Sequence, residues 1–372
     1  MKRYDFALVG GGIIGACVAE ELAAIGASVT VLDAGPEPGH ATRHAVGVAV
    51  PPLRHVADHV FYDWMRQAAH GLREDIDRLE PEYGQFSAPH AVLHVLRARN
   101  ADRMAPDLET AGAGSWIEPA RAAELAAGLR LPGNRRYLLD ETGFMVDGAR
   151  YLAAVRARCA ELDVDWRQHT TVWAVKDTSD LVELATSGGT VHADITVVTA
   201  GAWSGKPELT GHVVPVGPRR RQLVTLATET IPPLILSANR SLVPGLAGDV
   251  IVGATDDVAE VDAGFDDRCD VAGITRLLRF ATAVMPTLSR AVPVDLRAGL
   301  CSASASGWPL IGRVPGRQRL WLATGHAGHG LLTARYSARG LLVGLTKEEW
   351  DTVPWFMCPR RALEGKTCAS TM

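Results

Sequence analysis

The sequence lacks the features that mark membrane-spanning, metal-binding or nucleic-acid-binding proteins. No apolar run reaches the roughly 18 uninterrupted residues of a spanning helix. The six cysteines are scattered at positions 17, 159, 269, 301, 358 and 368, without a Cys-x-x-Cys pair or metal-site spacing. The formal net charge of −4 gives no reason to expect a nucleic acid or an anionic membrane as partner. These absences favour a cytoplasmic protein with reduced thiols and no bound metal.

The N-terminus also lacks a complete export signal, although it begins like one. Met1-Lys2-Arg3 is followed by apolar residues, and Ile14-Gly15-Ala16-Cys17 resembles a lipoprotein cleavage box. Cleavage there would destroy a glycine-rich loop, and the pair Glu20-Glu21 suits a folded helix better than a signal peptide. We therefore expect this segment to belong to the folded protein.

What the chain does contain is a complete strand–turn–helix–strand unit at its start. The apolar run Phe6-Ala7-Leu8-Val9 leads into Gly10-Gly11-Gly12-Ile13-Ile14-Gly15, and a helical pattern follows. A second β-branched run, Ser28-Val29-Thr30-Val31-Leu32, ends at Asp33. This order of elements is typical of a Rossmann-type dinucleotide-binding unit.

Each glycine of the unit has a physical role. Gly10 permits the tight turn, Gly12 lets the backbone approach a pyrophosphate, and Gly15 lets the helix pack close to the strand. The helix start presents unpaired N–H groups and the positive end of its dipole to the phosphates. Asp33 is placed to accept hydrogen bonds from a ribose. The unit therefore predicts dinucleotide binding.

The rest of the chain alternates between two kinds of sheet. The continuous β-branched run at 193–198 fits a parallel strand buried on both faces, and a strand, loop and helix follow at 319–345. Runs at 222–227, 240–243 and 250–254 instead suggest an antiparallel sheet between them. The sequence thus predicts an α/β fold: a discontinuous Rossmann-type domain with an inserted α+β domain on a mixed, largely antiparallel sheet.

Four segments together resemble a known family: Gly10 to Asp33, His40 to Gly47, Ala193 to Ser204, and Gly299 to Leu332. They are similar to the FAD-dependent D-amino acid oxidase family, on its glycine oxidase and D-amino acid dehydrogenase branch. The resemblance implies an FAD-binding domain and a substrate domain. We assign residues 1-80, 141-207 and 301-346 to the first, 81-140 and 208-300 to the second, and 347-372 to a loosely ordered or surface-packed tail.

The resemblance also implies which residues bind FAD. The glycine loop would hold the pyrophosphate, the 41–45 loop would run beside pyrophosphate and flavin, and the turn that opens the last helix would face the flavin. The implied set is Gly10, Gly12, Ile13, Ile14, Gly15, Asp33, Ala34, Thr42, Arg43, His44, Ala45, Val172, Ala200, Gly201, Gly328, His329, Gly330, Leu331 and Leu332.

Four residues are candidate catalytic residues: His44, Cys301, His329 and Arg221. In the related dimethylglycine dehydrogenases a histidine at the position of His44 bonds covalently to the flavin, and hydrogen bonding is the alternative. Cys301 is either a flavin attachment point, as in sarcosine oxidases, or a buried thiol that fills space. His329 would polarise the site or move protons. His326 would do the same, or be a loop histidine satisfied by backbone.

The chain departs from the family where amino-acid-oxidising members bind the substrate carboxylate. Ala298-Gly299-Leu300-Cys301 carries a thiol in place of the usual arginine, and Ser241 stands where a tyrosine is common. Three interpretations remain open. Another arginine binds the carboxylate (Arg219, Arg221, Arg297 or Arg54), the substrate is an atypical or carrier-tethered amine without a free carboxylate, or the protein binds flavin without turnover.

The expected reaction is oxidation of the C–N bond of an amine or amino acid to an imine, by hydride transfer to flavin N5. Oxidation of a 2-hydroxy acid on the same scaffold is the alternative. Either reaction needs oxygen or another electron acceptor to regenerate the flavin, and the sequence does not choose between these acceptors.

Overall fold

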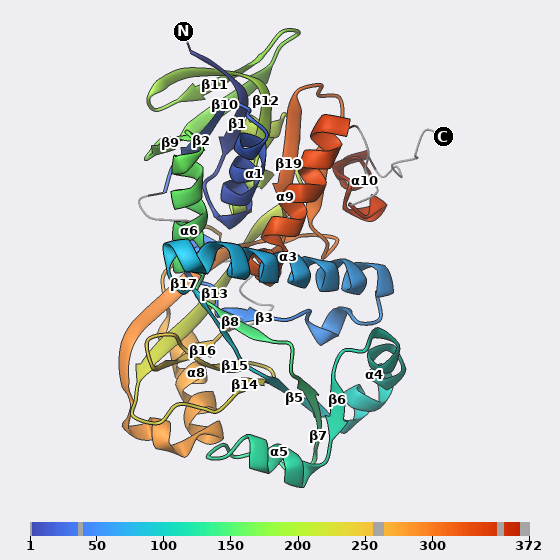
Figure 1. Cartoon of the computed structure of the whole chain (residues 1–372), viewed down its shortest axis with the longest axis vertical. Helices are drawn as coiled ribbons and strands as arrows, with labels where there is room; N and C mark the ends of the chain where they lie inside the picture. The colour runs from blue at the N-terminus through green and yellow to red at the C-terminus, as the bar shows by residue number, and fades with distance from the viewer. Residues whose placement is uncertain (1, 36–39, 256–263, 348–352, 365–372) are drawn as a thin grey trace.

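The computed structural model describes residues 2–35, 40–255, 264–347 and 353–364, and two eight-stranded sheets dominate it (Figure 1). The first sheet occupies the upper half of Figure 1 and the second the lower half, with helix α3 (His59–Tyr83) lying across the middle. This architecture confirms the predicted α/β fold with a mixed second sheet.

The first sheet is a Rossmann-type core of five parallel strands in the order β9-β2-β1-β12-β19. Two antiparallel extensions join it, one through β10 and β11 and the other through β18. The strands are β1 (Arg3–Val9), β2 (Val29–Asp33), β9 (Asp165–Gln168), β10 (Val172–Asp177), β11 (Val182–Thr186), β12 (Gly189–Val198), β18 (Leu310–Arg313) and β19 (Leu320–Thr324). The predicted parallel strand at 193–198 is thus confirmed between β1 and β19.

Helices α1 (Ile13–Ala24), α6 (Gly148–Glu161) and α9 (Gly330–Lys347) pack together beside this sheet, and α3 packs on α9 (Figure 1). A buried charge network joins them. Arg335 of α9 is 1% exposed and forms ion pairs with Glu20 and Glu21 of α1 and with Asp75 of α3. Arg78 also pairs with Glu20 and Asp75. Because each charge has a partner, the network fixes how the helices stand relative to one another.

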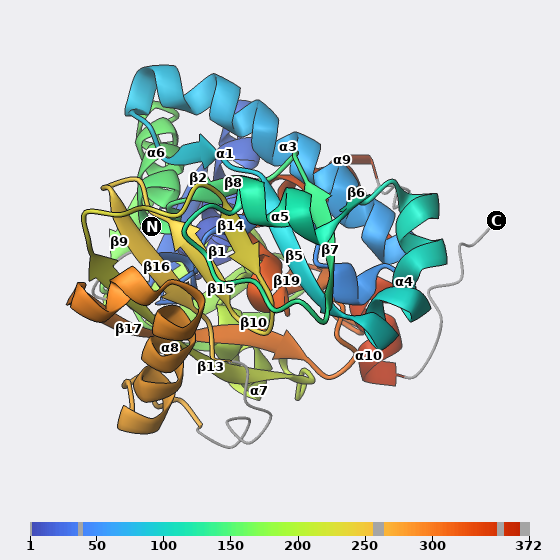
Figure 2. The ribbon, with the colours of Figure 1, turned by 90° about the horizontal axis from the view of Figure 1, so that it is seen from below.

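The second sheet has the order β17-β13-β16-β15-β14-β5-β7-β6, and every pair is antiparallel except β14 with β5. Helices α8 and α4 lie at opposite ends of it (Figure 2). The elements are β5 (Val92–Arg97), α4 (Ala98–Ala111), β6 (Ser115–Ile117), α5 (Pro119–Leu125), β7 (Arg135–Asp140), β13 (Val216–Ala227), β14 (Ile235–Ser237), β15 (Ser241–Pro244), β16 (Asp249–Gly253), α8 (Val271–Val284) and β17 (Val292–Ser304).

A small third sheet, β3-β8-β4, connects the two halves of the molecule. Its strands are β3 (Val48–Ala49), β4 (Ser87–Pro89) and β8 (Phe144–Val146), which come from three separate parts of the chain. The strands of the first large sheet lie within 1-80, 141-207 and 301-346, whereas β17 runs past the boundary at 300 to Ser304. The division into two domains with these limits remains a proposal.

The described part of the tail packs closely, in contrast to the loose order that one expectation allowed. Residues 355–357 form a 3₁₀ turn before helix α10 (Pro359–Glu364), and Met357 is fully buried. The ring of Phe356 contacts those of Phe61 and Trp308. Cys358 forms a disulfide, so the expectation of reduced thiols throughout is wrong at this position. Among the described helices, none combines the length and the apolar character needed to cross a bilayer.

Candidate active site

A cavity of about 1690 Å³ lies between the two large sheets. It exceeds the roughly 300–1,000 Å³ of a common ligand pocket. Exposed lining residues mark two openings: Trp173, Lys206 and Glu208 at one end, and Asn100 and Arg103 at the other. The cavity is therefore a passage with space for a long cofactor and a separate substrate.

The glycine loop forms one wall of the cavity, and its geometry requires glycine. Gly10 has φ +108°, and a Cβ there would lie 2.6 Å from the Thr199 carbonyl oxygen. A Cβ on Gly15 would lie 2.1 Å from the Gly10 oxygen, so this glycine allows the close packing of helix on strand. At Gly12 a Cβ would meet only the Thr42 hydroxyl, at 3.5 Å, on the side that faces the cavity.

Helix α1 begins at this wall, and no acidic side chain of its first turn neutralises the positive end of its dipole. Its N-cap is Gly12, which has no side chain to cap the helix, and its first turn contains no acidic residue. The amide of Ile13 donates to the Thr42 hydroxyl at 3.1 Å. The positive end of the helix dipole therefore faces open space, which suits the pyrophosphate of a dinucleotide.

Asp33 lines the cavity at the end of β2 and also braces the glycine loop. Its Oδ2 accepts a hydrogen bond from the Gly11 amide, and its Oδ1 accepts one from Gly35 at 2.8 Å. A carboxylate offers about four acceptor sites, so capacity remains for a ribose hydroxyl. Gly11 is a residue that the sequence reasoning passed over. A Cβ there would meet Trp166 at 2.6 Å and Asp33 at 2.8 Å.

Most of the residues expected to bind the cofactor come together around the cavity. Those that line it are Gly10, Gly12, Ile13, Ile14, Asp33, Ala34, Thr42, His44, Ala45, Val172, Ala200, Gly201, Gly328, His329, Gly330, Leu331 and Leu332. Gly15 lies behind the lining. Arg43 is exposed and outside it, and its carbonyl accepts a hydrogen bond from Arg297. Arg43 is therefore left out of the proposed cofactor site.

A second helix start also borders the cavity. Residues 327–329 form a 3₁₀ turn that leads into α9, whose first turn has no acidic residue. A Cβ on Gly328 or Gly330 would have no atom within 4 Å, so both glycines border open space. The start of α9 can therefore stabilise negative charge on a group bound in the cavity.

Two buried histidines line the cavity next to this turn. His329 Nε2 lies 2.8 Å from Arg54 Nη2, and because arginine can only donate, His329 accepts. Burial and then the charge of Arg54 lower the His329 pKa well below its ordinary value. Burial lowers the pKa of His326 to about 3. Its Nε2 lies 3.1 Å from the Ser337 hydroxyl, so a side chain of α9 holds it, and not the backbone as one expectation had it.

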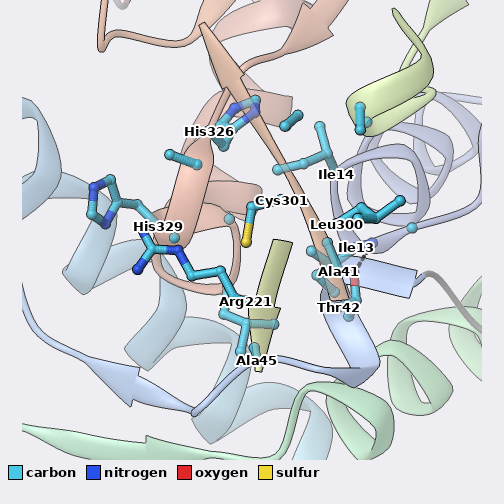
Figure 3. A pocket seen from close by; sticks show the side chains of 18 of the residues that line it. Ile13, Ile14, Ala41, Thr42, Ala45, Arg221, Leu300, Cys301, His326 and His329 are labelled. Atoms are coloured by element: carbon cyan, nitrogen blue, oxygen red, sulfur yellow. Dashed lines mark hydrogen bonds between the residues drawn. The ribbon is translucent and has the colours of Figure 1, made fainter. Parts of the chain in front are cut away.

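The structure separates the candidate arginines into two groups. Arg54 and Arg221 line the cavity, whereas Arg219 and Arg297 do not. Arg297 pairs with Asp295 at 3.0 Å. In Figure 3 the Arg221 side chain extends toward the ring of His329. Two arginines from distant parts of the chain thus meet at one histidine.

Cys301 and His44 also line the cavity. Figure 3 shows the Cys301 thiol beside the Arg221 side chain, on the side of the second sheet. Cys301 pairs with Arg219 across β17 and β13, and it is not in a disulfide. The candidate residues His44, Cys301, His329 and Arg221 therefore share one cavity.

The sequence reasoning missed several cavity residues from the second sheet. His94, Ser237 and Arg240 line the cavity from β5, β14 and the residue before β15. No motif marks them, because only the pairing of these strands brings them to one face. Alternation along each strand would have identified the face if the strand order had been known.

Comparison with known proteins agrees with this geometry. The family model described as FAD dependent oxidoreductase (DAO) matches residues 5–342. The chain is 29% identical over 364 residues to a glycine oxidase of Pseudomonas aeruginosa, covering 89% of this chain and 92% of the relative.

Solved structures show the same fold. A glycine oxidase from Geobacillus kaustophilus superposes with a TM-score of 0.83 at 23% identity, covering 94% of this chain and 96% of that one. An iminodiacetate oxidase from Chelativorans sp. BNC1 superposes with a TM-score of 0.82 at 24% identity, covering 94% and 97%. The chain therefore belongs to the FAD-dependent oxidoreductase (DAO) family, and it is a glycine oxidase-like flavoprotein enzyme with FAD as its cofactor.

Proposed function

We propose that the protein oxidises the C–N bond of an amino acid or N-substituted amino acid that carries a free carboxylate. The observation that carries this proposal is the meeting of Arg54 and Arg221 at His329 inside the cavity. A guanidinium is planar and can donate two parallel hydrogen bonds to a carboxylate. Two such groups compensate for the thiol of Cys301, which stands where family members carry an arginine.

The chain's residues would divide the work as follows. The glycine loop, Asp33 and the start of α1 hold the pyrophosphate and ribose, and the start of α9 faces the flavin. FAD, when bound, supplies the chemistry by accepting a hydride from the substrate carbon. Arg54 and Arg221 hold the carboxylate, which fixes the direction of the substrate C–H bond. Apolar lining residues such as Leu300 and Val46 exclude water.

Neither buried histidine is suited to removing the substrate's ammonium proton. His329 Nε2 already accepts from Arg54, and His326, with a pKa of about 3, is a weak base. His329 therefore acts as a positioning residue for Arg54. The proton leaves to solvent before hydride transfer, so the rate of flavin reduction should rise with pH through the pKa of the free amine, without a second inflection near 6.5.

The same observations weigh against the alternative reactions. Oxidation of a 2-hydroxy acid needs a base that takes the hydroxyl proton, and the two histidines beside the turn do not supply one. A carboxylate-free or carrier-tethered amine would make no use of the two guanidinium groups that line the cavity. Oxygen, or another electron acceptor, would complete the cycle.

The test is anaerobic mixing of the yellow holoprotein with matched compounds. We expect glycine, sarcosine or a larger N-substituted glycine to bleach the flavin absorbance, whereas methylamine, ethanolamine and glycolate leave it unchanged. Equal bleaching by amines without a carboxylate would contradict the role of the arginines. Bleaching by glycolate would favour the 2-hydroxy acid reaction. If no compound bleaches the flavin, the protein binds FAD without turnover on this class.

A further inference from the structure

The part of the cavity away from the glycine loop runs along one face of the second sheet. Gly253, Ser241, Ser237 and His94 line it, and they stand in register across β16, β15, β14 and β5. Neighbouring strands lie ~4.8 Å apart, so the two steps from β13, which carries Arg221, to β15, which Arg240 precedes, span ~10 Å, and the four steps to β5 span ~19 Å. These four residues form what we call the floor of the cavity. Because glycine and serine are small, the floor leaves room above it for an extended ligand.

Two side chains beside this floor have hydrogen-bonding capacity that no described residue uses. His94 is 5% exposed, and its Nε2 is buried without a partner. Burial lowers the His94 pKa to about 4, so the ring is neutral at pH 7 and can donate one N–H. Arg240 precedes β15; its Nε is buried without a partner, and its guanidinium forms no ion pair with a described residue. Leaving such groups unsatisfied is costly, so a ligand that bonds to them gains affinity.

Polar side chains line the opening beside this floor. Asn100 and Arg103 of α4 and Asn239 are exposed and line it. The acidic residue of this rim, Asp107, lies 3.3 Å from His59 and can pair with it. Arg103 and the two amides can donate hydrogen bonds to an anionic group that enters here.

We propose that the substrate is a long molecule with two anionic ends, whose second anionic group binds at Arg240 and His94. The carboxylate next to the reacting C–N bond binds at Arg54 and Arg221, and the chain between the two ends lies over Gly253, Ser241 and Ser237. This inference rests on the proposed function, because that function places the reacting end. The chemical class is an amino acid whose side chain or N-substituent ends in a carboxylate or phosphate.

The test measures binding without chemistry, by the change in flavin absorbance of the holoprotein at equilibrium. Suberate and sebacate are compared with octanoate and decanoate, which have the same lengths but one anionic end. We expect the dicarboxylates to bind about tenfold to a hundredfold more tightly, as expected for one added charged hydrogen bond. Succinate should gain nothing over butyrate, because it is too short to reach Arg240.

The variant Arg240→Gln should bring the ratio of affinities, dicarboxylate to monocarboxylate, close to one. The matched control is Arg279→Gln, which removes the same charge from an exposed position of α8 outside the cavity and should keep the wild-type ratio. Equal binding of the two series, or a ratio that Arg240→Gln leaves intact, would overturn the inference. If the ratio behaves as expected but no amine bleaches the flavin, the proposed reaction fails while the distal site stands.

Discussion

Removing either cavity arginine should weaken carboxylate binding without unfolding the protein. Arg221→Gln and Arg54→Gln each delete a charge that faces the cavity. Glutamine keeps some capacity to donate, so the loss is that of a charge-assisted hydrogen bond, about 1.5–3 kcal/mol. At about 1.4 kcal/mol for each tenfold change, the dissociation constant should rise about tenfold to a hundredfold.

The two substitutions should differ in a second respect. Both arginines lower the pKa of His329, Arg54 more than Arg221, so the loss of Arg54 should raise that pKa more, although burial still opposes protonation. Since both arginines would hold one carboxylate, the double variant should lose less than the sum of the two single losses.

The assay is titration of the holoprotein with acetate, followed by flavin absorbance, with thermal melts to confirm folding. Arg219→Gln is the matched control, because Arg219 shares a face of β13 with Arg221 but does not line the cavity. Its dissociation constant should stay within about twofold of wild type. If Arg219→Gln weakens acetate binding while the other two variants bind like wild type, the assignment of the anion site is wrong.

The remaining predictions concern stability and cofactor binding. The unfolded forms of His94 and His326 take up protons near pH 6.5, but the folded forms do so only near 4 and 3, so stability should fall as pH drops from about 6.5 to about 4. Each histidine should lower the free energy of unfolding by about 1.4 kcal/mol for each pH unit in this range. Urea titrations at several pH values measure this free energy, and a value that does not change with pH would contradict the prediction. Gly12→Ala should keep the fold but weaken FAD binding about tenfold or more, because the added methyl group enters the cavity. Gly15→Ala should instead destabilise the fold itself. Fluorescence titration with FAD and thermal melting distinguish the two effects. Arg335→Met should lower the free energy of unfolding in urea by about 3–5 kcal/mol, because Glu20, Glu21 and Asp75 lose their ion pairs with Arg335. A decrease near 0.5 kcal/mol would show that the network does not stabilise the fold.

Local patterns made the nucleotide-binding half predictable. The glycine loop, its two strands and Asp33 are adjacent in sequence, and their spacing alone defines the unit. The apolar pattern of residues 57–79 predicts a helix with Val60 on its apolar face, and the structure contains this helix as α3. Val60, however, is 60% exposed. The stripe begins instead at Phe61, whose amide is capped by Asp58.

The substrate half was harder to predict, for a physical reason. Helix α4 lies on the surface, buries only Ala101 and Leu108, and contains Pro106, so its apolar period is weak. The proposed anion sites combine residues from elements that are distant in sequence, such as Arg54 with Arg221, or His94 with Arg240. Sequence spacing does not encode such pairings, because strand order and register set them.

The Arg335 network should determine how the protein releases FAD on heating. Helices α1 and α9, whose starts line the cavity, are joined by the ion pairs of Arg335 with Glu20 and Glu21. We therefore expect that neither helix start moves away from its place on heating while the other stays. Release of yellow cofactor and loss of helical signal should occur as one event at one temperature.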